Sequence, residues 1–168
     1  MKSGELNRSL QNKKVDSFYV TFLRLPVTEN TSNILGRQVV SIDRPTINFN
    51  ISENYTKGIR QSFNNKIEYD PVTIVLDDDE NSLVIRSIIE QIKRQNGINS
   101  PSFNDSKFDV NVKCFDSLEN NVEEFTFLGC FVSNISNSTA IYTDSTDNQI
   151  TITLTFNTID YKFPILEA

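Results

Sequence analysis

The sequence predicts a mostly β fold of the α+β type: an antiparallel β-sandwich or barrel with one packed helix at about residues 80–96 and a protruding mid-chain hairpin. Short runs in which apolar and polar residues alternate recur along the chain, and such alternation is typical of strands with one buried and one solvated face. A single run has apolar residues at helical spacing. Because the strands cluster before and after this helix, without strand-helix-strand alternation, we expect antiparallel pairing.

The length of 168 residues fits one domain with one sizeable core. Residues 1–15 are polar with scattered apolar positions, so we expect a flexible or partner-ordered arm there. Residues 16–168 are then expected to form a single β domain. The sequence has no apolar run long enough for a signal peptide or a membrane span, so no membrane segment is expected.

The β domain is expected to begin with a strand at residues 17–25, which carries large aromatic side chains on both faces. Residues 27–36 are rich in Asn, Ser and Thr and are interpreted as a loop. Two extended runs follow, at residues 37–43 and 46–52. The second run alternates apolar residues with Asn, which predicts one buried and one solvated face.

Residues 52–66 are interpreted as an extended hairpin that projects from the core. This segment is polar with isolated apolar residues, and Gly58 near its centre tolerates the positive φ of a tight turn. A hairpin of this kind cannot bury its own apolar side chains, so Tyr55, Ile59 and Phe63 are expected to contact a partner.

Residues 72–76 alternate and predict a strand, and four consecutive acids, residues 77–80, separate it from the helix. A calcium loop places its acids at alternate positions around a Gly, whereas these acids are contiguous and contain none. Asp77 and Glu80 instead have the Asp-x-x-Glu spacing of a helix cap, and acids are favourable near a helix N-terminus. We therefore predict a cap at Asp77 and Glu80, with no metal site.

The predicted helix has an apolar stripe that can pack on the sheet and a polar face opposite to it. The stripe consists of Val84, Ile85, Ile88, Ile89 and Ile92. The polar face consists of Arg86, Glu90, Lys93 and Arg94. Glu90 and Arg94 have the spacing of a supporting ion pair, and Gly97 is expected to end the helix.

The second half of the domain is expected to add further strands. They are predicted at residues 107–115, 123–132, 138–143 and 149–163. Gly129 interrupts the alternation of its strand and predicts a β-bulge. The parity of the last run changes near Asn157.

The composition argues against an enzyme and against a nucleic-acid-binding surface. The formal net charge is −6, the sequence pI is about 4.7, and no Lys/Arg block offers phosphate contacts. The sequence has no His, the commonest general base and transition-metal ligand. Cys114 and Cys130 fall on faces that are expected to point inward. We therefore predict no catalytic, metal-binding or cofactor-binding residues.

Four segments, in order, carry a resemblance that covers about residues 18–163. They are FYVTF, then ISENYTKGIRQSFNNKIEYD, then YDPVTIVLDDDENSLVIRSIIEQI, and the closing run LGCFVSNISNSTAIYTDSTDNQITITLTFNTIDY. The closing run places a corner, a short strand, an acidic turn and a long strand at Gly129, Val132, Ile135, Asp144, Asp147, Asn148, Asp160 and Tyr161. This order resembles the tail tube proteins of contractile-tailed (myoviral) bacteriophages, which share a fold with tube proteins of type VI secretion and related contractile injection systems.

The resemblance implies a structural subunit that forms hexameric rings, in which strands of all subunits close one wide barrel. Rings stack through the hairpin, with expected contacts at Tyr55, Gly58, Ile59 and Phe63. DNA passes through the lumen without specific binding, and an acidic wall favours this because it does not hold phosphates. The expected lumen acids are Glu53, Glu68 and Asp70.

The same resemblance implies that the helix lies outside the barrel, where Arg86, Glu90, Lys93 and Arg94 can face a tail sheath. The other implied partners are baseplate proteins. The implied location is the virion tail, made and assembled in the cytoplasm of the host bacterium.

Two other functions are considered. One lies within the same family: a baseplate or tail-end adaptor that forms a single ring. The other is a monomeric β-sandwich binding module, in which Tyr142, Asp144 and Asp147 supply the aromatic and acidic loop residues of a ligand site. A metal-dependent enzyme built on residues 77–80 ranks below both.

Overall fold

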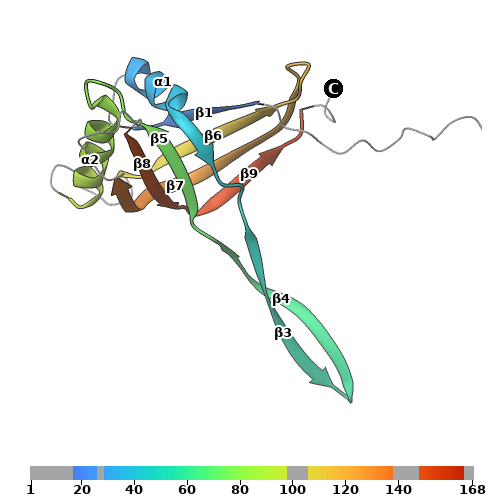
Figure 1. Ribbon diagram of the computed structural model, residues 1–168. Coiled ribbons are helices and arrows are strands. Elements are labelled where there is room, and N and C mark those ends of the chain that lie inside the picture. Colours follow the sequence, from blue (N-terminus) through green and yellow to red (C-terminus); the bar gives the residue numbers. More distant parts are fainter. Residues whose placement is uncertain (1–16, 26–28, 98–105, 138–147, 165–168) are drawn as a thin grey trace, which may run out of the picture.

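A computed structural model of the chain describes residues 17–25, 29–97, 106–137 and 148–164. These residues form strands and two helices (Figure 1). In chain order the elements are β1 (Ser17–Leu23), α1 (Glu29–Arg37), β2 (Val39–Ile42), β3 (Ile47–Thr56), β4 (Ile59–Tyr69), β5 (Val72–Asp77), α2 (Leu83–Gln95), β6 (Phe108–Phe115), β7 (Asn121–Asn137), β8 (Gln149–Thr155) and β9 (Thr158–Lys162). The arm predicted at residues 1–15 and the strand predicted at 138–143 lie outside the described residues.

Seven strands form one antiparallel sheet in the order β1-β6-β7-β8-β5-β2, with β9 paired to β7. The long strand β7 organises this sheet, because its first part pairs with both β6 and β9 and its second part pairs with β8. The predicted class, mostly antiparallel β, is confirmed. The sheet of the single chain does not close into a barrel, since β1 and β2 stand at its two ends.

The sheet bends where β7 passes from one set of partners to the other. Gly129 has a φ of +67°, and the buried parity of β7 changes there from Phe127 to Cys130. Opposite this point, Asn157 lies between β8 and β9, and its backbone N–H donates to the carbonyl of Leu128 at 2.9 Å. The bulge predicted at Gly129 and the parity change near Asn157 are thus two sides of one corner.

The core fills the concave side of this bent sheet. The alternating positions of β5, β6 and β8 are buried as the sequence predicts. The largest side chains with almost no exposure are Phe108, Phe125, Phe127, Ile74, Leu76, Ile150, Ile152 and Leu154. Aromatic rings also contact each other in the core: the centroids of Phe127 on β7 and Phe156, the residue after β8, are 4.8 Å apart. Both cysteines are buried in this core.

The helix α2 packs on one end of the sheet (Figure 1). Its last turn is fixed to β7, because Gln95 Nε2 donates to the Val132 carbonyl at 2.6 Å and Gln95 Oε1 accepts from the Val132 N–H at 3.1 Å. The buried positions are Val84, Ser87, Ile88 and Gln91. The buried stripe is therefore rotated from the predicted one. Ile89, which was predicted to be buried, is exposed, whereas the polar Gln91 is buried and its side chain donates to the Ser106 carbonyl.

The N-terminus of α2 is capped by different acids from those predicted. The Asp79 carboxylate accepts from the N–H groups of Leu83 at 2.5 Å and Val84 at 3.2 Å, and Asp78 accepts from a third at 3.4 Å. Asp77 belongs to β5, where its carboxylate accepts from the Gln149 side chain. The prediction of a cap at Asp77 and Glu80 is wrong because α2 begins at Leu83, too far along the chain for that spacing.

A second helix, α1, occupies most of the segment predicted to be a loop at residues 27–36. Its composition favours loops, since Asn, Ser, Thr and Gly are weak helix formers. Tertiary contacts with β1 stabilise the helix instead. Leu35 is buried, and Ser32 Oγ donates to the Phe22 carbonyl.

The strands β3 and β4 form a separate two-stranded ribbon that extends away from the body (Figure 1). This confirms the predicted hairpin and lengthens it, because the run at residues 46–52 belongs to the ribbon rather than to the sheet. The expected burial of one face of that run is therefore wrong for the single chain: Ile47, Phe49 and Ile51 are all exposed.

Candidate assembly surface

The hairpin is a continuation of the β2–β5 strand pair at the edge of the sheet. Its tip is a two-residue turn in which Lys57 and Gly58 both have positive φ, at 54° and 78°. Two successive residues with positive φ match the type I′ turn, whose twist suits a β-ribbon. The projecting ribbon is therefore built by regular strand pairing from root to tip.

The pairing register divides the hairpin into two different faces. Ile47 pairs with Tyr69 and Phe49 pairs with Ile67, so these four side chains share one face. A register shift between Asn50 and Ile51 changes the parity of β4 beyond that point. The face that carries Ile47, Phe49, Ile51, Tyr55, Ile67 and Tyr69 is called the apolar face of the hairpin, and near the tip it also carries the Glu53–Arg60 ion pair.

The predicted contact residues are divided between these faces. Tyr55 lies on the apolar face, and Gly58 is in the turn. Ile59 and Phe63 pair with Thr56 and Ser52 on the opposite face. Sequence reasoning missed Phe49 and Ile67, although the alternation of residues 46–52 runs directly into the predicted hairpin and could have indicated that the hairpin starts there.

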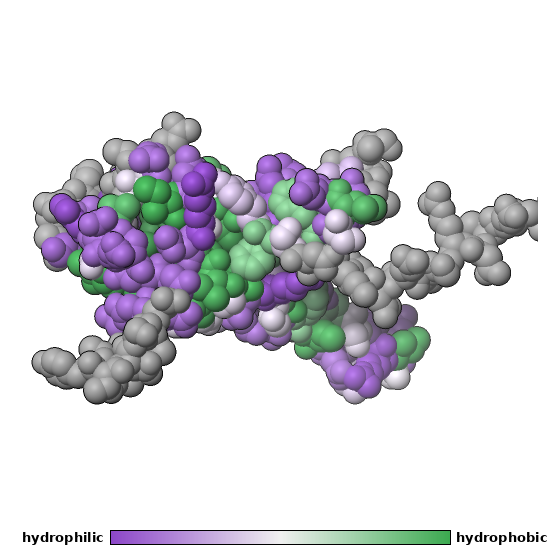
Figure 2. Space-filling model, turned by 45° about the horizontal axis from the view of Figure 1, so that its top comes forward, coloured by the Kyte–Doolittle hydropathy of each residue, from purple (hydrophilic) through white to green (hydrophobic). Residues whose placement is uncertain are grey.

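These apolar side chains have few neighbours within the chain. The exposed fraction is 53% for Phe49, 66% for Ile51, 67% for Tyr55 and 52% for Ile67. Figure 2 shows hydrophobic residues at the surface of the projecting hairpin. An exposed apolar surface of this extent on an ordered element is typical of a protein–protein contact.

The root of the hairpin is fixed to the body by one contact from each side of the ribbon. On the β4 side, the Tyr69 ring lies 5.5 Å from the ring of Phe156, and its hydroxyl is 3.4 Å from Thr158 Oγ1. On the β3 side, Arg44 forms an ion pair with Glu123 at 3.3 Å. The Glu123 side chain is only 9% exposed and lies on the inner face of β7. We call these two contacts the root contacts.

The expected lumen acids are engaged on the hairpin itself. Glu53 pairs with Arg60, and Glu68 pairs with Lys66 at 2.7 Å. The Lys66 ammonium lowers the pKa of Glu68 by its hydrogen bond and its charge. At the root, Asp70 accepts from the Asn48 side chain at 2.7 Å. Two of the three acids therefore have their charge balanced by a neighbouring cation, and the hairpin is not a strongly acidic element.

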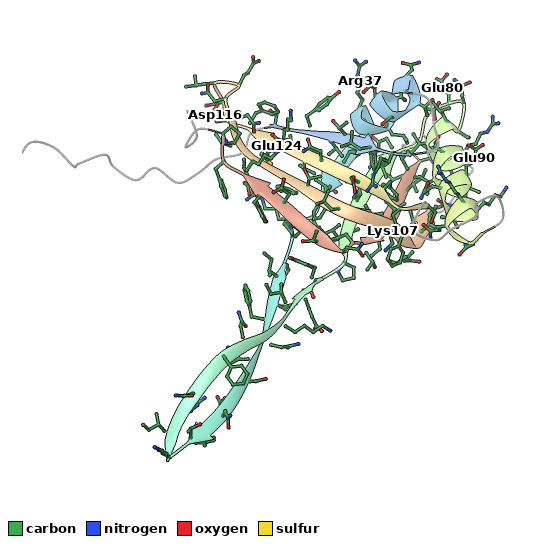
Figure 3. All side chains as sticks on the ribbon, turned by 180° about the vertical axis from the view of Figure 1, so that it is seen from behind. Arg37, Glu80, Glu90, Lys107, Asp116 and Glu124 are labelled. Atoms are coloured by element: carbon green, nitrogen blue, oxygen red, sulfur yellow. The ribbon has the colours of Figure 1, made fainter. Side chains whose placement is uncertain are left out.

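The outer face of α2 carries the predicted polar residues. Arg86, Glu90 and Lys93 are exposed, and Arg94 is partly buried. Arg86 Nε donates to Glu90 Oε1 at 3.3 Å, so Glu90 pairs with the residue one turn before it. Figure 3 shows Glu90 pointing away from the sheet, which leaves this face open to a partner.

The described part of the chain offers little for catalysis or metal binding. Among those residues, no group of three or more Cys, Asp or Glu side chains is arranged to hold a metal ion. Burial raises the pKa of the Cys130 thiol to about 12, which keeps it protonated and unreactive at neutral pH. No helix in the described ranges is both long and apolar enough to cross a membrane.

Comparison with known proteins identifies the fold through similar solved structures. No protein-family model matches the sequence, and no curated protein matches it. A chain of the anti-feeding prophage baseplate has a TM-score of 0.63 and 12% identity, with 91% of this chain and 98% of that chain covered. A chain of the sheath/tube terminator of the extracellular contractile injection system PVC has a TM-score of 0.65 and 12% identity, with 90% and 97% covered. Hcp1 from Salmonella typhimurium has a TM-score of 0.51 and 13% identity, with 89% of each chain covered. The chain therefore has the fold of tube-type proteins of contractile injection systems.

Proposed function

We propose that this chain is a structural subunit of a phage tail tube. The observation that carries the proposal is the hairpin: an ordered ribbon with an exposed apolar face, on a body with the tube fold. In a monomeric binding module these apolar side chains would stay exposed to solvent, whereas such exposed patches usually mark a contact with another protein. Identical copies supply both the hairpin and the surface that covers it.

In the proposed assembly, six copies form a ring in which their strands close a wider barrel, and rings stack through the hairpins. The sheet of a single chain is open, and unpaired strand edges are ready templates for pairing with another copy. The stacked rings enclose a conduit for DNA inside a contractile sheath, which contacts the outer face of α2. The net charge of −6 per copy favours passage of DNA, because the wall does not attract phosphates.

A second proposal is a ring at the end of the tube, in the baseplate or at the tail tip. The structural likeness favours it as much as the first proposal, since TM-scores to a baseplate structure and to a tube-terminating cap are both 0.63. The two proposals differ in one measurable respect. A tube subunit polymerises without limit, whereas an adaptor stops at a ring.

The test is negative-stain electron microscopy of the purified chain, with light scattering across a concentration series. We expect hollow tubes or rings that grow with concentration. Phe49→Asp, on the apolar face of the hairpin, is expected to prevent stacking while the subunit stays folded by circular dichroism. Ile89→Asp is the matched control, because it places the same charge on an exposed apolar position of α2. A wild-type chain that stays monomeric at every concentration would contradict the proposal.

A further inference from the structure

The β6–β7 turn presents a leucine to solvent on a fixed support. Leu118 is 78% exposed, the highest value among the large hydrophobic side chains in the described ranges. The turn is held by Asp116, whose carboxylate accepts from the backbone N–H groups of Leu118 and Asn120, both at 2.9 Å, and from the Asn120 side chain. These bonds lower the pKa of Asp116, so the carboxylate is charged at neutral pH. The turn therefore fixes an apolar side chain between two acids, Asp116 and Glu119.

A hollow with complementary properties lies beside the end of β1. It is lined by Thr21, Phe22, Leu23, Arg24, Leu25, Ser32 and Asn33, which come from β1, the residues after it, and α1. Its apolar lining includes Leu23, which is 42% exposed. Arg24 is its only charged lining residue, and the Arg24 side chain is 59% exposed. The hollow thus combines an apolar wall with a cation, whereas the turn combines an apolar leucine with two acids, so the two features are complementary.

The turn and the hollow lie at opposite ends of the same sheet. In the β1–β6 pairing, Leu23 lies beside Asp109 and Ser17 lies beside Phe115, so the hollow is at the start of β6 and the turn is at its end. The eight residues of β6 separate them by roughly 27 Å at about 3.4 Å per residue. Figure 3 shows Lys107 and Asp116 at these two ends. The two features cannot meet within one chain.

We propose that Leu118 inserts into the β1–α1 hollow of a second copy of this chain, so that successive copies meet head to tail along the strand direction. The acids of the turn then face the exposed guanidinium of Arg24, which still has N–H donors beyond the one bound to Asp109. A contact between two different patches of identical subunits repeats from copy to copy, and it gives a closed ring or an open filament depending on the rotation between copies. The inference rests on the proposed function for its partner, and it adds a contact between copies that does not involve the hairpin.

Cysteine cross-linking tests the contact directly. The chain carrying Ser117→Cys and Asn33→Cys keeps Leu118 and places one thiol on the turn and one in the hollow, both at exposed positions, while the native cysteines are buried. Treatment of the concentrated protein with a short bismaleimide is expected to give a ladder of covalent oligomers. Ser117→Cys combined with Lys93→Cys, on the outer face of α2, is the matched control and is expected to give no ladder.

The outcomes separate this inference from the proposed function. Tubes or rings in the micrographs without a ladder would overturn the Leu118 contact and leave the tube proposal standing. Neither tubes nor a ladder would overturn both. A ladder of covalent oligomers that the control variant does not give supports the Leu118 contact, whether or not tubes are seen in the micrographs. As an independent readout, Leu118→Ser is expected to raise the critical concentration for assembly roughly tenfold, from the lost burial of one leucine, without changing the melting temperature.

Discussion

At the scale of single residues, the fold depends on two glycines at which an added Cβ would collide with a neighbouring atom. Gly36 in α1 lies against β1 so closely that an added Cβ would be 2.1 Å from the carbonyl oxygen of Val20. Gly129 combines a φ of +67° with a Cβ position only 2.5 Å from the Asn157 side chain. The first glycine allows a helix to cover β1, and the second allows the sheet to turn its corner.

Gly36→Ala is therefore expected to destabilise the fold. The methyl group would collide with backbone rather than with a flexible side chain, so α1 has to move away from β1, and we expect the free energy of unfolding to fall by about 1–3 kcal/mol. Urea unfolding followed by circular dichroism measures this. Asn33→Ala, at an exposed position of the same helix, is the control and is expected to be neutral or slightly stabilising. Equal stability of Gly36→Ala and the wild type would contradict the packing of α1 on β1.

The acidic run before α2 is expected to respond unequally to substitution. Asp79→Ala removes the acceptor of the Leu83 and Val84 N–H groups, and loss of such a cap costs about 1 kcal/mol. Glu80→Ala, at the neighbouring exposed position, is expected to change the free energy of unfolding by much less. The measurement is the urea midpoint of each variant. A larger loss of unfolding free energy for Glu80→Ala than for Asp79→Ala would show that Glu80 caps the helix, as the sequence predicted.

At the scale of elements, the sequence predicted the strands better than their partners. The alternation of β5, β6 and β8 is regular because each strand has one face on the core, so periodicity alone locates them. The hairpin shows similar alternation, yet its apolar face is exposed in the single chain. Alternation predicts that one face of a strand is buried, but it does not identify the surface that covers that face. Helix α1 was missed for the opposite reason: its stability comes from contacts with β1 and not from its own residues.

The root contacts could not have been predicted either, since a lone Arg44 and a Glu123 nearly eighty residues apart carry no local signal. In the structure they have a clear consequence: together with Tyr69 they hold the ribbon from both of its sides. A ribbon fixed at two points has one direction relative to the body. The proposed stacking of rings needs such a fixed direction, because the hairpin has to reach the same surface on each partner.

Glu123→Gln is expected to free the hairpin without unfolding the body. Spin labels on Lys57→Cys at the hairpin tip and Ser136→Cys on β7 measure the tip-to-body distance by pulsed electron resonance in the monomeric subunit. We expect a broader distance distribution in Glu123→Gln than in the labelled parent, because the Arg44 guanidinium loses its charged partner. Glu90→Gln breaks an exposed ion pair of α2 and is the control. An unchanged distribution in Glu123→Gln would contradict a role of the Arg44–Glu123 ion pair in fixing the hairpin.

At the scale of the whole molecule, the proposed assembly has to overcome the repulsion of like-charged copies. Each copy carries a net charge of −6, whereas the described surfaces that we assign to contact are largely apolar. Glu53 and Glu68 are paired with cations, so the hairpin contributes little to the repulsion. The excess of acids lies on the body, where four of them are contiguous at residues 77–80.

Salt is therefore expected to promote assembly. The Debye length falls from about 30 Å at 0.01 M to about 8 Å at 0.15 M ionic strength, which screens the repulsion between copies, while burial of apolar side chains does not weaken. We expect the critical concentration, measured by light scattering, to fall as sodium chloride is raised over this range. Glu80→Lys, which replaces an exposed acid by a base, should lower it at 0.01 M and have little effect at 0.15 M. A critical concentration that rises with salt would mean that ion pairs such as the one inferred at Arg24, and not apolar burial, supply most of the attraction between copies.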